Sequence, residues 1–202
     1  MIRLYGFEVS GNCYKIRLFL SLINHDYENV VVDVKAGENR TPEFLQMNPN
    51  GLLPVLTDGD NVIYDSAAIL TYLAATYAQA WLPREPIELA RVVRWLAFEQ
   101  SEGRYGLARA RAMVRKMPSP MAKLGTLDES QTIGTDALQI LEQQLSRCRW
   151  LIGNDHPTIA DIACFPYTAM SEQGGLSLDE YPSINRWLDA VRQLPGYVPL
   201  PD

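Results

Sequence analysis

The sequence predicts two domains of different class, an α/β domain at residues 1–79 and an all-helical domain from about residue 88 to residue 202. Two observations support this prediction. Residues 1–79 alternate between short β-branched runs and runs with the apolar period of a helix. After a connector at residues 78–86, which contains Pro83 and Pro86, the apolar period is helical throughout.

The predicted elements of the first domain change type in a regular order. A strand at residues 2–5 is followed by a helix whose apolar stripe runs from Ile16 to Ile23 with helical spacing. The elements after it are a strand at 27–34, a helix beginning at Thr41-Pro42, two strands at 53–57 and 62–64 around a turn, and a helix at 66–77. The order β-α-β-α-β-β-α is a thioredoxin-like arrangement.

The second domain is predicted to contain helices only. A long helix begins at Leu89 and runs to about Lys116, where Pro118-Ser119-Pro120 breaks it. A second helix is expected at residues 133–145. Thr158 and Asp161 have the spacing of a capping box ahead of an apolar helix, and a last helix follows Pro182.

Composition limits the classes of function. The 202 residues are 47% hydrophobic and 21% charged, which is typical of a soluble globular protein. The net charge of −6 argues against general nucleic-acid binding, and no apolar run approaches the roughly 18 residues of a membrane span. Cys13, Cys148 and Cys164 are too few and too scattered for a disulfide framework or a metal site. We therefore expect a cytoplasmic protein without a metal.

The most informative stretch is N-P-N-G-L-L-P-V-L at residues 48–56, followed by Y-D-S-A-A-I at residues 64–69. Pro54 inside a short apolar run indicates a turn, most simply with a cis bond, just before an edge strand. Such a turn leaves the backbone N–H and C=O of Val55 for another extended peptide. Asp65 and Ser66 open a helix, where they are well placed for a carboxylate ligand. Together the two runs predict a site for a small peptide with an amine and a carboxylate.

These motifs resemble the glutathione-binding half of the cytosolic glutathione transferases, and the similarity covers nearly the whole chain. The resemblance implies that glutathione is a co-substrate, bound at Leu53, Pro54 and Val55, with Val55 pairing with its cysteinyl backbone. It implies that Asp65 and Ser66 hold the γ-glutamyl amine and carboxylate. It also implies a homodimer with the active site beside the interface.

The sequence departs from the family pattern at two glutathione contacts. Leu52 stands where many relatives have Lys, Arg or Gln reaching the glycyl carboxylate. Lys35, Arg40 or Asn50 could supply this contact, and Lys35 is the first choice. Asp65 is also shorter than the usual Glu or Gln, which predicts weaker binding of glutathione.

Glutathione chemistry requires a thiolate, since a thiol with a pKa of about 8.5 is mostly protonated at neutral pH. The stabilising donors are expected between the first strand and first helix, at residues 9–15. By resemblance, Ser10 lies at the position of a zeta-like serine and is the main predicted donor. Asn12 lies where disulfide-reducing members have asparagine, and it is expected to assist through its amide or its backbone N–H. Cys13 is expected to be a small buried helix residue, and a redox role is the alternative.

The second substrate is predicted to lie against the long helix, at Tyr105, Ala108 and Arg109. Arg104, Arg111 and Met113 belong to the same region of the sequence. This mixture suits an apolar electrophile or an anionic disulfide, and the alternative is that the arginines face solvent or a dimer partner. His25 and His156 have no nucleophile nearby in the sequence and are assigned no role.

Three functions follow from the resemblance. The first is a glutathione transferase whose thiolate attacks an electrophilic carbon. The second is a glutathione-dependent disulfide reductase, in which the same thiolate attacks sulfur and which Asn12 favours. The third is a non-catalytic interaction protein with the same fold, against which the presence of the motifs around Pro54 and Asp65 argues.

Overall fold

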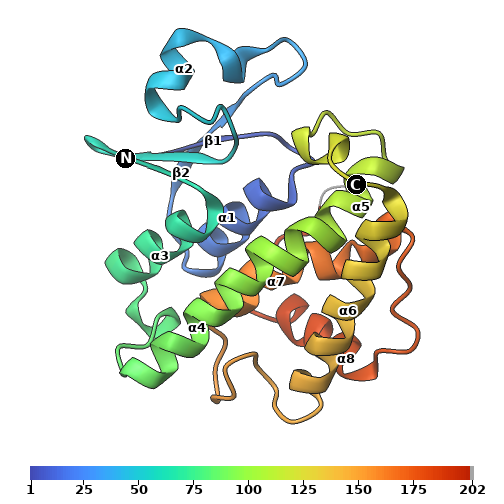
Figure 1. Ribbon diagram of the computed structural model, residues 1–202. Helices are drawn as coiled ribbons and strands as arrows, with labels where there is room; N and C mark the ends of the chain where they lie inside the picture. Colours follow the sequence, from blue (N-terminus) through green and yellow to red (C-terminus); the bar gives the residue numbers. More distant parts are fainter. Residues whose placement is uncertain (201–202) are drawn as a thin grey trace. The chain divides into compact units, whose positions relative to one another are not determined.

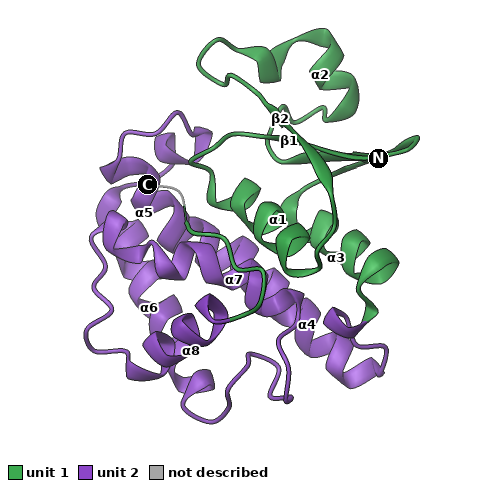
Figure 2. Ribbon diagram, turned by 180° about the vertical axis from the view of Figure 1, so that it is seen from behind, with its two compact units in different colours: residues 1–79, 194–202 green, residues 80–193 purple. Residues whose placement is uncertain are grey.

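A computed structural model describes residues 1–200 of the chain, which divides into two compact units (Figure 2). Unit 1 contains residues 1–79 together with the end of the chain from Leu194, and unit 2 contains Ala80–Gln193. Unit 1 is an α/β structure and unit 2 is helical, which confirms the predicted fold class. No described helix has both the length and the apolar character needed to cross a membrane.

Unit 1 contains a four-stranded mixed sheet. Its elements are β1 (Ile2–Gly6), α1 (Gly11–Leu22), β2 (Tyr27–Val31), the short 3₁₀ turn η1 (Glu38–Arg40), α2 (Pro42–Met47), β3 (Val55–Asp58), β4 (Asn61–Tyr64) and α3 (Ser66–Tyr77). The strand order is β2-β1-β3-β4, in which β1 and β2 are parallel and the other neighbours are antiparallel. The predicted β-α-β-α-β-β-α order is confirmed, although β2 ends at Val31, three residues earlier than expected.

The expectation that Pro54 precedes an edge strand is wrong. β3 lies between β1 and β4, and Val55 is opposite Tyr5 on one side and Tyr64 on the other. Backbone N–H and C=O groups point sideways toward the neighbouring strands of a sheet. Because Val55 has a strand on each side, its backbone cannot also receive a peptide as an edge residue would.

The helices cover both faces of this sheet. α1 and α3 pack against each other on one face, and α2 lies on the other (Figure 1). Ile16, Phe19 and Leu20 on α1 are fully buried, as the helical stripe predicted. On the α2 side, Phe44 packs with Val32 and Val55. This core fixes the positions at which α1, β3 and α3 begin, and the predicted residues Ser10, Asn12, Leu53, Pro54, Asp65 and Ser66 lie at or next to these starts.

The end of the chain belongs to unit 1. Tyr14 on α1 donates its hydroxyl hydrogen to the carbonyl of Val198 at 2.6 Å, and Ser21 donates to the carbonyl of Gly196 at 2.7 Å. This segment was predicted to belong to the second domain, whereas the structure assigns it to unit 1. In the structure, these two hydrogen bonds hold it alongside α1.

Unit 2 is built from helices. They are α4 (Pro86–Phe98), the π-helical segment η3 (Glu99–Ala108), α5 (Arg109–Val114), α6 (Leu127–Leu145), α7 (Ile159–Ala169) and α8 (Pro182–Arg192), with the 3₁₀ turns η2 (Gln79–Trp81), η4 (Pro120–Lys123) and η5 (Ser171–Gly174). The predicted long helix corresponds to α4, η3 and α5 in succession. η3 packs closely on α6 at two glycines, because a Cβ atom on Gly106 would lie 2.6 Å from the backbone nitrogen of Gly134.

Capping boxes begin two of these helices. The predicted box of Thr158 and Asp161 is present at the start of α7. A second box, of Thr126 and Glu129, starts α6 at Leu127, six residues before the predicted start at Ile133. The spacing T-x-x-E was visible in the sequence, so this helix start could have been predicted.

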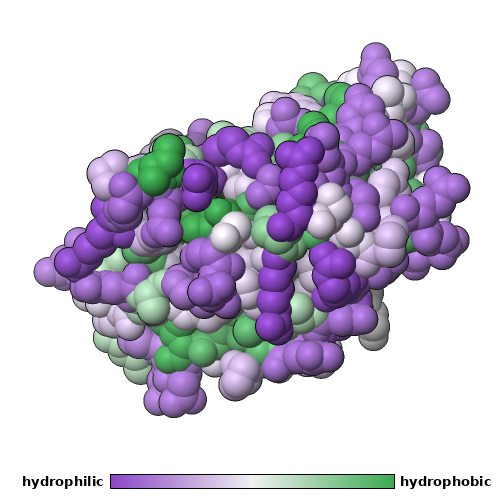
Figure 3. All heavy atoms as spheres, turned by 90° about the horizontal axis from the view of Figure 1, so that it is seen from below, coloured by the Kyte–Doolittle hydropathy of each residue, from purple (hydrophilic) through white to green (hydrophobic). Residues whose placement is uncertain are grey.

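Polar side chains dominate the face of the molecule drawn in Figure 3, where hydrophobic residues form small separate patches. Exposed apolar residues do occur on α4, where Leu89 and Val93 are 37% and 54% exposed. They are four residues apart and so lie on one face of that helix.

Candidate functional site

The start of α3 has an unsatisfied buried hydroxyl. Asp65 is the N-cap residue with a positive φ of 74°, and its carboxylate accepts a hydrogen bond from the backbone N–H of Ala67 at 2.9 Å. Ser66 is only 2% exposed, and its Oγ has no hydrogen-bond partner among the residues that the structure describes. A buried polar atom without a partner costs about 1–3 kcal/mol. A bound carboxylate at this helix start would satisfy it.

The loop before β3 is held by side-chain amides. Asn48 is buried, donates its Nδ2 hydrogen to the carbonyl of Leu52 at 2.9 Å and accepts from the backbone N–H of Asn50 at 3.0 Å. Asn39 donates to the carbonyl of Gly51 at 2.8 Å. These bonds fix the chain that enters Leu53.

The bond between Leu53 and Pro54 is cis, as expected from the sequence. Leu53 precedes the first paired residue of β3, so its backbone is outside the ladders that occupy Val55. The position available to an extended peptide is therefore Leu53, two residues before the one that the resemblance indicated.

The start of α1 brings Ser10 and Asn12 together. Ser10 is the N-cap, and its Oγ accepts from the backbone N–H of Cys13 at 3.3 Å. This bond uses an oxygen lone pair and not the hydroxyl hydrogen. Asn12 is half-buried, and its Oδ1 accepts from the ammonium of Lys15 at 2.8 Å.

Cys13 is a packed residue, as expected. Its side chain is fully buried, and its sulfur accepts a long hydrogen bond from the backbone N–H of Phe7 at 3.4 Å. Burial raises the pKa of the Cys13 thiol, which outweighs the opposite effect of the hydrogen bond with Ser10. A buried, protonated thiol is a poor nucleophile.

The three candidates for the glycyl carboxylate lie in two places. Arg40 donates to the carbonyl of Asn50 at 3.0 Å, so these two residues meet at the loop that precedes Leu53. Lys35 is exposed in the turn after β2, where its backbone N–H donates to Asp33 at 2.9 Å.

The predicted second-substrate residues lie in unit 2, on η3 and at the start of α5. Tyr105 is 40% exposed, and the guanidinium groups of Arg104 and Arg109 lie 5.9 and 5.8 Å from its ring centroid. Arg109 is buried and donates to the hydroxyl of Ser130 at 2.7 Å, while Ala108 is half-buried. The alternative that the arginines face solvent is wrong for Arg109 and also for Arg111, which is buried and donates to Gln173 at 2.6 Å.

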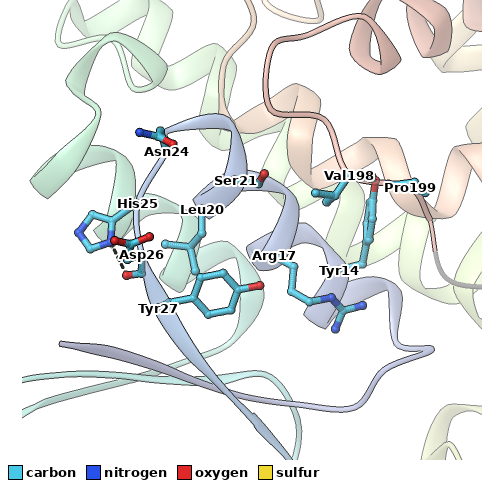
Figure 4. A pocket seen from close by; sticks show the side chains of 10 residues that line it. All are labelled: Tyr14, Arg17, Leu20, Ser21, Asn24, His25, Asp26, Tyr27, Val198 and Pro199. Carbon is cyan, nitrogen blue, oxygen red and sulfur yellow. Dashed lines mark hydrogen bonds between the residues drawn. The ribbon is translucent and has the colours of Figure 1, made fainter.

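A separate cavity of about 410 Å³ lies in unit 1, along α1 (Figure 4). Figure 4 shows Arg17 and the Tyr27 hydroxyl pointing toward the same part of this cavity, with His25 farther along the turn that follows α1. His25 also packs on Tyr77 with ring centroids 4.5 Å apart. None of the predicted glutathione contacts lines this cavity.

The fold and these site residues together define a family. The chain matches the family model of the glutathione S-transferase N-terminal domain at residues 4–81 and that of the C-terminal domain at residues 110–195. This protein therefore belongs to the glutathione S-transferase family.

Individual relatives are similar over nearly their whole lengths. The chain is 29% identical to glutathione S-transferase GstB of Escherichia coli, over 97% of this chain and 95% of that protein. It is 30% identical to disulfide-bond oxidoreductase YfcG of the same organism, over 97% and 92% of the two chains. The crystal structure of a glutathione S-transferase from Pseudomonas fluorescens superposes with a TM-score of 0.91, at 38% identity over 100% and 99% of the two chains.

Proposed function

We propose that this protein is a glutathione transferase that joins the sulfur of glutathione to small electrophiles. The observation that carries this proposal is the hydroxyl of Ser66 at the start of α3, next to Asp65 in the chain, which is buried and has no partner in the described part of the chain. A ligand with an adjacent amine and carboxylate satisfies both residues, and the γ-glutamyl group of glutathione has this chemistry. Family membership supports the same ligand.

The rest of glutathione follows from this anchor. The backbone of Leu53 pairs with the cysteinyl residue, beside Pro54 and the buried Val55. The glycyl carboxylate is bound by Lys35, with Arg40 and Asn50 as the alternative pair at the neighbouring loop. The Arg40 guanidinium donates to a neutral carbonyl, that of Asn50, in the same loop.

The sulfur is activated at the start of α1. Lowering a thiol pKa by two units requires stabilising the thiolate by roughly 2.7 kcal/mol. One hydrogen bond to a charged group contributes about 1.5–3 kcal/mol. The Ser10 hydroxyl is the main donor and the Asn12 amide assists, so the two residues can supply the required free energy.

In the transferase reaction the thiolate attacks an electrophilic carbon, a C–S bond forms, and the leaving group departs with its electron pair. Tyr105, Ala108 and Arg109 are the residues proposed for the second substrate. We also propose that the protein is a cytoplasmic homodimer; the exposed Leu89 and Val93 on α4 give it apolar surface to bury.

The second candidate is a glutathione-dependent disulfide reductase. Its thiolate attacks a sulfur atom, forming a mixed disulfide and releasing the other sulfur as a thiolate. The presence of Asn12 and the 30% identity to disulfide-bond oxidoreductase YfcG favour this reaction. An interaction protein without activity has less support, because it has no use for the buried hydroxyl of Ser66.

The test is the pKa of bound glutathione, measured from thiolate absorbance in wild type, Ser10→Ala and Asn12→Ala. We expect a wild-type value about two units below that of free glutathione and a rise of about one to two units in Ser10→Ala. Parallel assays with chlorodinitrobenzene and with hydroxyethyl disulfide separate attack on carbon from attack on sulfur. A rise in Asn12→Ala alone, with turnover of the disulfide only, favours the reductase, and absence of binding contradicts both enzymes.

A further inference from the structure

Lys15 is the most completely buried cation near the proposed reaction site. It lies on α1, has no exposed surface, and its Nζ donates to Oδ1 of Asn12 at 2.8 Å. Residues three positions apart lie on the same side of a helix, so this contact is built into α1. The burial of Lys15 means that water screens this bond less than it would a surface contact.

The hydrogen bond with Lys15 determines which end of the Asn12 amide faces the Lys15 ammonium. An ammonium group has three donors and no acceptor, so the amide atom beside it must be the oxygen. The Nδ2 group, with its two hydrogens, is therefore at the other end of the amide. Asn12 is half-buried, and it shares the first turn of α1 with the capping residue Ser10.

The ammonium also changes the strength of the amide as a donor. A hydrogen bond from a charged group is shorter and stronger than a neutral one, and it polarises the next bond in a chain. Electron density drawn toward Oδ1 leaves the Nδ2 hydrogens more positive. An amide in the opposite orientation would present its oxygen and repel a thiolate.

We propose that Lys15 is a positioning residue for the transferase reaction, which holds the Asn12 amide so that Nδ2 donates to the glutathione sulfur. This inference rests on the proposed function, because it requires a bound thiolate. Lys15 acts through Asn12 and does not contact the sulfur itself.

Arg17 provides a matched control on the same helix. It also carries a positive charge, but its Nη2 donates to the carbonyl of Glu8 at 2.7 Å and not to Asn12. Arg17→Met therefore removes one charge from α1 and leaves the Asn12 contact in place.

The experiment is a double-mutant cycle on the pKa of bound glutathione, with Lys15→Met, Asn12→Ala, the double variant and Arg17→Met. We expect Lys15→Met to raise this pKa by about 0.5–1 unit. At a pH below the pKa, the fraction of bound glutathione present as thiolate would then fall about three- to tenfold. The double variant should match Asn12→Ala, since Lys15 has no route to the sulfur once the amide is gone. Arg17→Met should leave the value close to wild type.

Three results overturn the inference. The first is that Lys15→Met does not raise the pKa of bound glutathione. The second is that Lys15→Met raises this pKa by the same amount in the Asn12→Ala background as in wild type, and the third is that Arg17→Met raises it as much as Lys15→Met does. The second and third would show that the charge acts at a distance. In each case, the proposed function would still be supported if the wild-type protein lowers the pKa of bound glutathione and conjugates it to an electrophile. If wild type does not bind glutathione, the proposed function fails as well.

If Lys15→Met does not fold, Lys15→Gln replaces it in the same measurement, because glutamine retains an N–H donor near the same position. We expect a smaller rise in the bound pKa, with the KM for glutathione unchanged and kcat reduced at low pH only. A change confined to the unfolding midpoint, with the pH profile of wild type, would indicate a structural role and contradict the inference.

Discussion

The starts of α3 and α7 are both capped by side-chain oxygens, with different outcomes. At α7 the carboxylate of Asp161 is fully buried and accepts hydrogen bonds from the backbone N–H of Leu151 and of Thr158, both at 2.9 Å, and from the Trp187 indole at 3.0 Å. At α3 the exposed carboxylate of Asp65 makes one capping bond, and the buried Ser66 hydroxyl makes no hydrogen bond within residues 1–200. The first helix start is complete within the protein, whereas the second leaves a hydroxyl for the proposed ligand.

This difference separates a stabilising device from the proposed binding site. Every donor around Asp161 is satisfied by the fold itself, so removing this carboxylate should change stability and leave glutathione binding intact. At α3 the expected effects are reversed, because the fold does not satisfy the Ser66 hydroxyl.

The largest effect is expected for Asp161→Asn. The substituted amide keeps one acceptor but turns an N–H group toward donors, so at least one of the N–H groups at Thr158, Leu151 or Trp187 loses its partner. We expect the free energy of unfolding to fall by about 3 kcal/mol. Urea denaturation measures this loss. Asp189→Asn is the control, since Asp189 pairs with Arg192 at the surface and should change stability by less than about 0.5 kcal/mol.

The second effect is on binding, in Ser66→Ala. Removing a buried hydroxyl without a partner should leave the free energy of unfolding unchanged or slightly higher. The Kd for glutathione, measured by calorimetric titration, should rise about tenfold, the equivalent of about 1.4 kcal/mol.

Thr158→Ala is the matched comparison for Ser66→Ala. Its hydroxyl accepts from the N–H of Ala160 in the cap of α7, so its loss should cost about 1 kcal/mol of stability. The Kd for glutathione should not change. Equal effects of the two variants on binding would remove the distinction between the two helix starts.

Local signals in the sequence predicted both of these sites. The proline turn, the Asp65-Ser66 pair and the T-x-x-D spacing each act within a few residues, so the pattern alone indicates where the turns and helix starts lie. The interaction of Asn12 with Lys15 is also local, and its helical spacing could have revealed it.

Features that depend on distant parts of the chain were not predicted. The interior position of β3 depends on its pairing with β1 as well as β4, and the sequence of a single strand does not reveal its neighbours. The return of the chain end to α1 depends on a hydrogen bond between Tyr14 and Val198, 184 residues apart. Whether the Ser66 hydroxyl has a hydrogen-bond partner likewise depends on how distant parts of the chain pack around it.

The smallest effect is expected for Asp65→Asn, which separates the two tasks of this residue. Asparagine is as good an N-cap as aspartate and has the same shape, so the cap of α3 and the stability should be retained. The negative charge that the proposed contact with the γ-glutamyl amine requires is lost.

We expect Asp65→Asn to raise the Kd for glutathione about three- to fivefold, because an ion pair at an exposed carboxylate contributes about 1 kcal/mol or less. The increase should diminish in high salt, where this ion pair is screened in wild type as well. Ser66→Ala should show little such dependence, since its contact is a buried hydrogen bond. A loss of stability in Asp65→Asn without weaker binding would make α3 resemble α7, and the carboxylate would then be only a cap.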